Sequence, residues 1–206
     1  MIFDPTEKPF SEIHKLMIGS IVPRPIALVS TTSKDGNNNV APFSYFNGVC
    51  SNPPTIMFAP ARRGWDGHEK DTLINIRNNQ EFVINIVSES FAEKMVKCST
   101  DFDPNIDEFQ VSGLTPESSS KVSPPKVKES KINLECKLDQ IVEIGDGKAG
   151  SGFVVLGTIV LFHIDDDIYE DGHILLDKLE PLGRLAGNWY TRPTDNLKIT
   201  RQVKPK

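Results

Sequence analysis

Long apolar runs and an excess of positive charge are both missing from this sequence. No stretch approaches the roughly 18 apolar residues that cross a membrane, and the opening residues MIFDPTEKPF lack the basic start and apolar run of a secretory signal. The 206 residues carry a formal net charge of -5, whereas a nucleic-acid surface needs surplus lysine and arginine. We therefore expect a soluble cytoplasmic protein that binds neither membrane nor nucleic acid.

Cysteine is scarce, and the cysteines that are present lie far apart. Cys50, Cys98 and Cys136 form no CxxC pair and leave an odd count. This spacing argues against a disulfide framework and against a zinc site. We expect these residues to be buried free thiols.

Motifs of metal-dependent and covalent catalysis are missing as well. His68 begins HEKDT rather than HExxH, and the acidic stretch 101–112 has Ile106 where a calcium loop needs glycine and Ser112 where it needs glutamate. There is no GxSxG nucleophile elbow, and GDGKAGSG at 145–152 is not a phosphate loop. We predict no metal and no catalytic side chain, which leaves a bound cofactor to carry any reaction.

What is present is typical of a globular β protein. Hydrophobic residues make up 38% and charged residues 25%, close to ordinary values, and 15 prolines with 14 glycines indicate many turns. About six strand-like runs outnumber two or three short helical ones, and most neighbouring strands are joined as hairpins. We predict one domain over 1–206, mainly β, built as an antiparallel barrel or sandwich with short helices at its ends.

The first predicted hairpin joins IALVSTT at 26–32 to NVAPFSYFNGV at 39–49 through Asp35-Gly36, a dipeptide typical of tight turns. Pro42 lies inside the second run. Because proline cannot donate to a sheet, it indicates an edge, a bulge or an opening there. Further strands are expected at 55–59, 81–87, 132–144 and 153–164.

Two short helices are predicted from possible capping residues. Asp71 and Thr72 are candidate caps for a helix within 70–80, and Ser90 followed by Glu93 has the capping-box pattern for a helix over 90–99. The second helix would bury its apolar face, which consists of Phe91, Met95 and Val96.

The stretch 100–128 is rich in aspartate, serine and proline and has little strand or helix pattern. One turn of helix is predicted at 104–109. Loops of this length inside a domain are usually functional or mobile, and we expect the same here.

The order of these segments resembles the flavin reductase-like family of FMN-binding split barrels. The resemblance runs over about 12–192 through RPIALVST, NVAPFSYFN, SNPP, KDTLINI, EFVINIV, GLTP, SPPKVKES, LECKL, VVLGTIVLFHI and LEPLGRLAGNWY. It implies a Greek-key split β-barrel that forms a homodimer and holds one FMN at each of two sites shared between the subunits. An FMN needs a flat apolar slot for its ring, donors for its carbonyl oxygens and anchors for its phosphate.

The candidates for the ring lie on the run that Pro42 interrupts, where backbone amides would be free to face a ligand. Phe43 and Tyr45 would wall the ring, and Ser44 or Asn47 would donate to its carbonyls. The alternative is an ordinary irregular strand with its aromatic residues in the core. The candidate set is Ala41, Pro42, Phe43, Ser44, Tyr45 and Asn47.

The first candidates for the phosphate are Lys70, Asp71 and Thr72, which precede or begin a predicted helix. The first amides and the positive dipole end of a helix favour an anion. Lys70 would add charge and Thr72 a hydroxyl. Simple helix capping by Asp71 is the alternative.

Two further pairs are weaker candidates. Ser30 and Thr31 would add hydroxyls to a phosphate site, or are plain strand formers. Arg62 and its neighbour Arg63 would reach a phosphate or a nicotinamide cofactor, or are exposed loop arginines.

Near the carboxyl end, PLGRLAGNWY places Arg184, Trp189 and Tyr190 beside two glycines that allow close backbone approach. The aromatic side chains would cover the ring or seal a dimer interface, as in similar proteins, or would be core residues. His163 is a weaker candidate for contact with the flavin and is otherwise a satisfied surface or core histidine.

The function predicted from this resemblance is an NAD(P)H-dependent flavin reductase, an FMN-binding oxidoreductase that passes hydride from nicotinamide to flavin. Two alternatives stay open: a tight FMN-binding electron-transfer protein that serves a redox partner, as flavoredoxin does, and a flavin-binding protein without enzymatic activity. The choices between NADH and NADPH, and between FMN and FAD, are left open as well.

Overall fold

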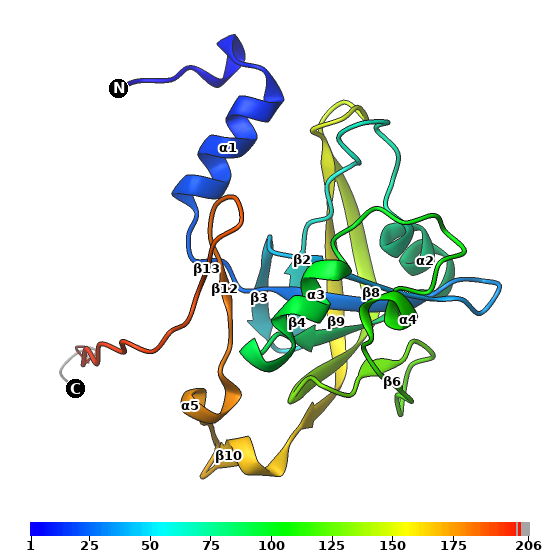
Figure 1. Cartoon of the computed structure of the whole chain (residues 1–206), viewed down its shortest axis with the longest axis vertical. Coiled ribbons are helices and arrows are strands. Elements are labelled where there is room, and N and C mark those ends of the chain that lie inside the picture. Colours follow the sequence, from blue (N-terminus) through cyan, green and yellow to red (C-terminus); the bar gives the residue numbers. More distant parts are fainter. Residues whose placement is uncertain (201, 203–206) are drawn as a thin grey trace.

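A seven-stranded antiparallel sheet forms the centre of the computed structural model, which describes residues 1–200 and 202 (Figure 1). The strand order is β2-β1-β5-β8-β9-β4-β3. The strands are β1 Ala27–Thr32, β2 Asn38–Phe43, β3 Phe46–Ser51, β4 Pro54–Phe58, β5 Glu81–Ile86, β8 Ile132–Ile144 and β9 Gly152–Ile164. The prediction of a mainly β, antiparallel fold with short helices is confirmed.

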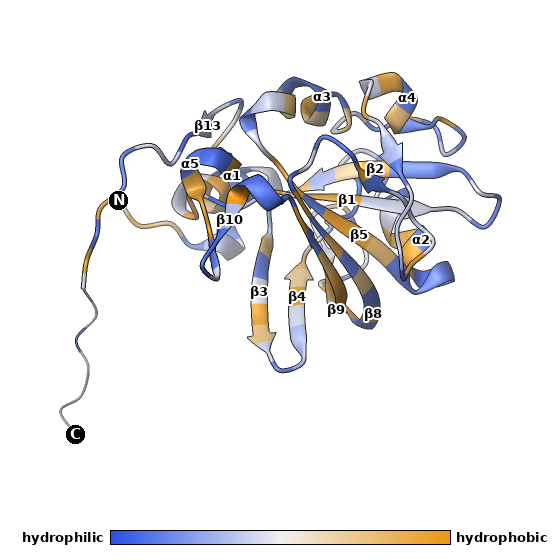
Figure 2. Ribbon diagram, turned by 90° about the horizontal axis from the view of Figure 1, so that it is seen from below, coloured by the Kyte–Doolittle hydropathy of each residue, from blue (hydrophilic) through white to orange (hydrophobic). Residues whose placement is uncertain are grey.

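The two edges of this sheet are adjacent in the chain. β2 and β3 lie at opposite ends of the strand order, yet only Ser44 and Tyr45 separate them in sequence. A sheet whose edge strands are joined by two residues must curl until those edges are neighbours, and because β2 and β3 share no ladder the barrel is split between them. Figure 2 shows β3 and β4 standing apart from β1 and β2, with β8 and β9 between them.

The prediction of one strand over 39–49 is therefore wrong. The chain leaves one edge of the sheet after Phe43 and joins the other edge at Phe46. Pro42 nevertheless lies on the edge strand β2, as its missing amide donor predicts. The Asp35-Gly36 turn is also confirmed, with Gly36 at a φ of 86°.

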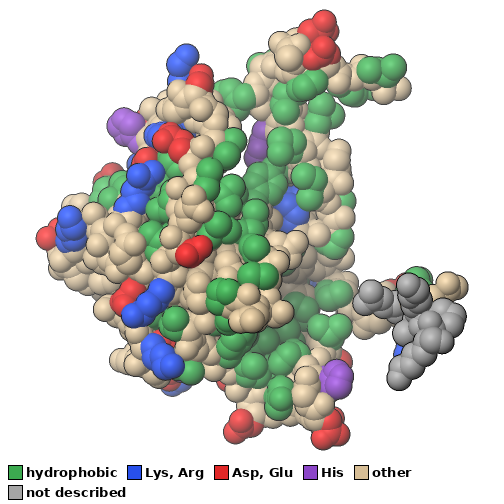
Figure 3. Space-filling model, turned by 180° about the vertical axis from the view of Figure 1, so that it is seen from behind, with side chains coloured by type: hydrophobic (Ala, Val, Ile, Leu, Met, Phe, Trp, Pro, Cys, Tyr) green, Lys and Arg blue, Asp and Glu red, His purple; other side chains and the backbone are tan. Residues whose placement is uncertain are grey.

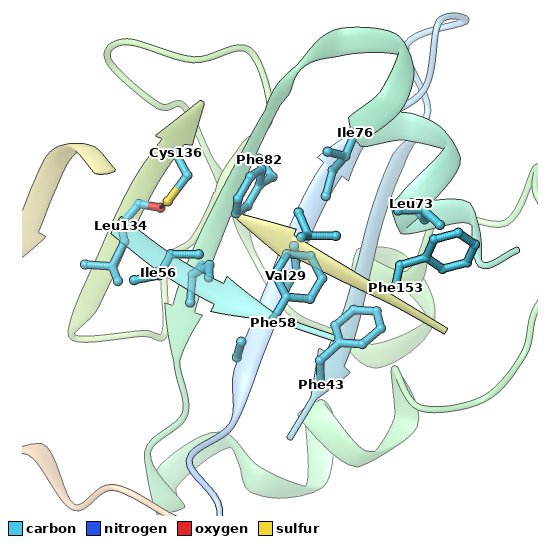
Figure 4. Close-up of a cluster of buried hydrophobic side chains, with 13 residues drawn as sticks. Val29, Phe43, Ile56, Phe58, Leu73, Ile76, Phe82, Leu134, Cys136 and Phe153 are labelled. Carbon is cyan, nitrogen blue, oxygen red and sulfur yellow. Dashed lines mark hydrogen bonds between the residues drawn. The ribbon is translucent and has the colours of Figure 1, made fainter. Parts of the chain in front are cut away.

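Both faces of β1 are buried, because successive side chains of a strand point to opposite sides. Ala27 and Val29 point into the barrel, where they join a cluster that includes Phe58 and Phe82 (Figure 4). Leu28 belongs to a second cluster outside the barrel, with residues of α3 and α4. The barrel wall therefore carries a second, helix-covered core on the side of β1 and β2.

Five α-helices surround the sheet in the described part of the chain: α1 Phe10–Ser20, α2 Asp71–Asn79, α3 Ala92–Lys97, α4 Glu108–Ser112 and α5 Leu176–Leu179. α2 covers the barrel core with Leu73 and Ile76. α1 and α5 were not predicted; α1 buries none of its residues and projects from the body (Figure 1). None of the helices among residues 1–200 is long and apolar enough to span a membrane.

The capping predictions were wrong in detail. α2 has Lys70 at its N-cap position without a side-chain cap, and Asp71 pairs with Arg63 instead. Ser90 lies inside a 3₁₀ turn at Glu89–Phe91, so it is not placed to cap α3. Phe91 and Met95 are buried as predicted, whereas Val96 is exposed.

The long stretch 100–128 packs against the barrel through buried polar anchors. The carboxylate of Glu135 on β8 accepts the backbone amides of Ser120, Lys121 and Val122 at 2.6–3.1 Å. α4 begins at Glu108, later than the predicted turn at 104–109, because Asp107 caps it. The stretch also contains the two-stranded pair β6 Pro116–Glu117 and β7 Lys126–Val127.

Two further two-stranded pairs follow the barrel: β10 Tyr169–Glu170 with β11 His173–Ile174, and β12 Gly183–Arg184 with β13 Tyr190–Thr191. Among the cysteines, Cys98 and Cys136 are buried free thiols as predicted, but Cys50 is exposed because it lies on the edge strand β3.

Candidate functional site

A cleft opens where the edge strand β2 faces the first residues of α2. We call it the α2 cleft. Its other walls come from the turn after α3 and from α4. Ala41, Pro42, Phe43, Lys70, Asp71 and Thr72, which the sequence predicts as site residues, all line it, together with Asn39, Arg63, Cys98, Ser99, Thr100, Asp101, Phe102 and Glu108.

A second hollow adjoins the α2 cleft and shares Pro42, Phe43 and Ser99 with it. Ser44, Arg184 and Tyr190 complete its wall, and the guanidinium carbon of Arg184 lies 4.5 Å from the Tyr190 ring centre. The two volumes, about 70 and 170 Å³, are each below the roughly 300 Å³ of an ordinary ligand pocket. Their shared wall makes them one continuous surface along residues 41–44.

A larger hollow, about 560 Å³, lies between α1 and the barrel. Tyr45 and Arg62 line it, opposite Phe10 and Met17 of α1. Because Tyr45 follows Ser44 directly, this hollow and the second hollow are lined by neighbouring residues of the junction between the two edge strands.

Charges in the α2 cleft are paired across its walls. Lys70 Nζ donates to Asp101 Oδ1 at 2.9 Å, and Arg63 Nη2 donates to Asp71 Oδ2 at 2.8 Å. Burial raises the pKa of Asp101, but the hydrogen bond and charge of Lys70 outweigh this and leave it below its usual value.

Glu108 is a third carboxyl in this cleft, and no cation from the described part of the chain pairs with it. It is 7% exposed, and its Oε1 accepts from Asn39 Nδ2 at 2.6 Å while Oε2 accepts from the Val40 amide at 3.3 Å. Burial raises the pKa of Glu108 to about 7, and the charge of Asp71 adds to that effect. Glu108 is therefore about half protonated near neutral pH.

Asn39 is the centre of a buried hydrogen-bond network beneath the cleft. Its Oδ1 accepts from Thr72 Oγ1 at 2.9 Å and from Thr31 Oγ1 at 3.2 Å. The Thr72 hydroxyl, a predicted phosphate donor, thus already donates its hydrogen to Asn39. Ser30 Oγ likewise donates to the Pro125 carbonyl at 2.5 Å, and Ser30 and Thr31 are fully buried, so neither lines the cleft.

Three buried polar atoms have no hydrogen-bond partner among the described residues: Tyr45 Oη, Arg62 Nε and Arg63 Nε. Buried polar groups are nearly always paired, so unpaired donors beside hollows point to a ligand or a partner molecule. The Arg63 donor belongs to the α2 cleft, and the other two belong to the hollow beside α1. Guanidinium and hydroxyl donors next to an apolar wall fit FMN, which presents a phosphate and ring carbonyls.

The other predicted residues lie away from the cleft. Asn47 is exposed on β3, where its Oδ1 accepts the Gly48 amide. Trp189 is 75% exposed beside β13. His163 contacts Glu135 at 2.5 Å and so supports the anchor of the 120–122 segment.

Sequence reasoning missed Asn39, Glu108 and Arg24, which are all buried. Glu108 lies in the single turn of helix predicted at 104–109, where nothing marked it as a site residue, and Arg24 precedes the first strand in sequence. No local pattern marks a polar residue whose partner lies far along the chain.

The site contains no residue set for metal-dependent or covalent chemistry. Among the described residues no three histidines, cysteines or acids form a group that could hold a metal. Burial raises the pKa of the Cys98 thiol to about 11, which keeps it protonated and unreactive. The surface is suited to binding an anion and a flat apolar group.

Several solved structures share the fold of this chain over nearly its whole length. Nitrilotriacetate monooxygenase component B from Bacillus cereus is 35% identical, with a TM-score of 0.92 over 97% of this chain and 98% of that one. The 2-nitrobenzoate 2-nitroreductase of Pseudomonas fluorescens is 31% identical, with a TM-score of 0.87 over 98% and 97%. A split-barrel protein of Shewanella frigidimarina, 23% identical, has a TM-score of 0.82 over 98% and 100% and supports the fold alone.

The expected split barrel is thereby confirmed. The model of the flavin reductase-like domain matches residues 18–182, which contain the barrel, α2 and all the residues that line the α2 cleft. The chain therefore belongs to the flavin reductase-like family.

Proposed function

We propose that this protein is an FMN-binding oxidoreductase that reduces flavin with NADH or NADPH. The observation that carries the proposal is the α2 cleft, in which the apolar segment 41–43 lies beside the basic side chains of Arg63 and Lys70 and the first turn of a nine-residue helix. The first amides of a helix have no partner within it and favour an anion.

In this proposal, Lys70, Arg63 and the start of α2 hold the FMN phosphate, and the ring lies along residues 41–45. A bound FMN would supply the hydride-accepting chemistry, because amino-acid side chains offer no ready hydride acceptor. The chain contributes binding, orientation and exclusion of water. Arg184 and Tyr190 would cover the far end of that surface.

The proposal includes a homodimer. α1 has no buried residue and exposes Phe10, Leu16 and Met17, while β3 exposes Val49. Figure 3 shows hydrophobic side chains gathered along one face of the molecule. Exposed apolar surface of this extent is typical of an interface. A second copy that covers α1 would also close the hollow that Tyr45 and Arg62 line.

The test combines spectroscopy with ligand titration. We expect the purified protein to quench FMN fluorescence saturably, and anaerobic NADH or NADPH to bleach the flavin absorbance. Turnover that requires added flavin would identify a reductase with diffusible flavin, whereas tightly retained flavin that is reduced and reoxidised by a protein would favour the flavoredoxin-like alternative. Bound flavin that neither nucleotide reduces would leave only a flavin-binding function.

The oligomeric state has its own test. Light scattering after size exclusion is expected to give twice the mass of one chain. Met17→Asp on α1 is expected to lower that mass, whereas Lys15→Asp, on the same helix but not apolar, is the matched control. A monomeric native protein would contradict this part of the proposal.

A further inference from the structure

When Glu108 is ionised, the charge balance of the α2 cleft opposes the binding of a phosphate. Two basic side chains, Arg63 and Lys70, face the three carboxyls of Asp71, Asp101 and Glu108. Each cation is already within 3 Å of one aspartate, so the third carboxyl is left without a counter-charge. A dianionic phosphate would enter a cleft that is negative whenever Glu108 is ionised.

Glu108 is the carboxyl best placed to lose its charge. Its two oxygens accept from neutral donors, the Asn39 amide at 2.6 Å and the Val40 amide at 3.3 Å. Because its hydrogen bond to the Val40 amide is the longer one, Oε2 is the oxygen that can carry a proton with little loss of hydrogen-bond energy. A protonated Oε2 would also be a hydrogen-bond donor, which an ionised carboxylate cannot be.

We infer that Glu108 takes up a proton when a phosphate-bearing ligand enters the α2 cleft, so that affinity for FMN weakens as the pH rises above neutrality. The inference rests on the proposed function, since it takes FMN as the ligand. Binding of an anion beside a carboxyl favours the neutral form of that carboxyl. By linkage, the affinity then falls over the range between the two protonation midpoints.

Among residues 1–200, no other group around Glu108 accounts for such a change near neutral pH. Asp71 and Asp101 in the cleft are each paired with a cation. Burial raises the pKa of Cys98, which faces Glu108 from the end of α3, to about 11. β2, on the other side of α4, carries no titratable side chain over Asn38–Phe43. The second ionisation of a phosphate, near 6, strengthens binding as the pH rises and so has the opposite sign.

The experiment compares FMN with riboflavin, which has the same ring and no phosphate. The dissociation constant is measured from pH 6.5 to pH 9 by fluorescence quenching for the native protein, for Glu108→Gln and for Glu93→Gln on the exposed side of α3 as control. We expect the constant for FMN to rise about tenfold in the native protein and the control. The dissociation constant for FMN should change by less than about twofold in Glu108→Gln. The constant for riboflavin should change by less than about twofold in all three proteins.

A second measurement uses the native protein alone, so it does not depend on whether Glu108→Gln folds. Calorimetry of the native protein at pH 7.5, in buffers of different ionisation enthalpy, should show proton uptake with FMN and none with riboflavin. FMN binding without proton uptake, or with the same pH profile in Glu108→Gln, would overturn the inference and leave the proposed function intact. Failure to bind either flavin would overturn the proposed function and this inference with it.

Discussion

Arg24 Nε lies 3.2 Å from Ser44 Oγ, at the point where the chain passes from one edge of the barrel to the other. The same guanidinium donates from Nη1 to the carbonyls of Ile18 and Ile21 at 2.8 and 2.6 Å, and from Nη2 to that of Leu185 at 3.1 Å. Arg24 is 4% exposed. One buried cation thus ties together the end of α1, the β2–β3 junction and the carboxyl-terminal ribbon.

Replacement of Arg24 is expected to be costly, because Arg24→Met removes the buried donor that three backbone carbonyls share. We expect a loss of about 3 kcal/mol in the free energy of unfolding, measured by urea denaturation. α1 should also become sensitive to proteolysis. Lys15→Met, at an exposed position of α1, is the control and should change stability by less than about 0.5 kcal/mol. Equal stability of both variants would show that the hydrogen bonds of Arg24 contribute little to the free energy of unfolding.

Gly157 on β9 is expected to tolerate no side chain. A Cβ there would lie 2.3 Å from Cζ of Phe82, which is fully buried in the barrel core against Phe58. Gly157→Ala should therefore cost about 2 kcal/mol by overpacking. Gly48→Ala on β3, where nothing lies within 4 Å of the added atom, is the matched control. Thermal unfolding of both variants tests the difference.

Glu108 gives stability a pH dependence with a definite sign. Its folded-state pKa, about 7, lies above the value of 4.5 expected in the unfolded chain. The folded state therefore binds more protons between these values, and the contribution of Glu108 to stability falls as the pH rises from about 4.5 to about 7. The full difference is about 3 kcal/mol, taken as an upper figure.

The measurement is the difference in unfolding free energy between the native protein and Glu108→Gln at several pH values. The subtraction removes the contribution of carboxyls with a lowered pKa, whose stabilising effect grows as the pH rises. Glu135 is one of them: burial raises its pKa, but hydrogen bonds from His163 and backbone amides outweigh burial. A pH-independent difference would contradict the assignment.

Lys70→Met is expected to weaken the binding of the FMN phosphate without weakening the binding of the flavin ring. Loss of one charge-assisted contact should raise the dissociation constant of FMN about tenfold and leave that of riboflavin within about twofold. Lys137→Met on β8, outside the α2 cleft, is the control. An equal loss for both ligands would place the phosphate elsewhere.

Local pattern was enough to locate most strands and the short helix after KDT. The candidates 41–43 and Lys70 came from the family resemblance, and the structure brings them to one cleft. Period-two alternation reports which residues face a core, and proline reports an edge, because both effects act within a few residues. The exposed helix α1 lies outside what such patterns detect, since it buries none of its apolar residues.

Only the tertiary structure decided how the edges of the sheet meet and which polar groups are buried together. The passage from β2 to β3 at Ser44 depends on the curl of the whole sheet, which no local run encodes. Asn39 and Glu108 are 69 residues apart, and Arg24 and Leu185 are 161 apart. Packing brings such groups into contact, and because burial removes water, their partners and their protonation follow from that contact rather than from neighbours in sequence.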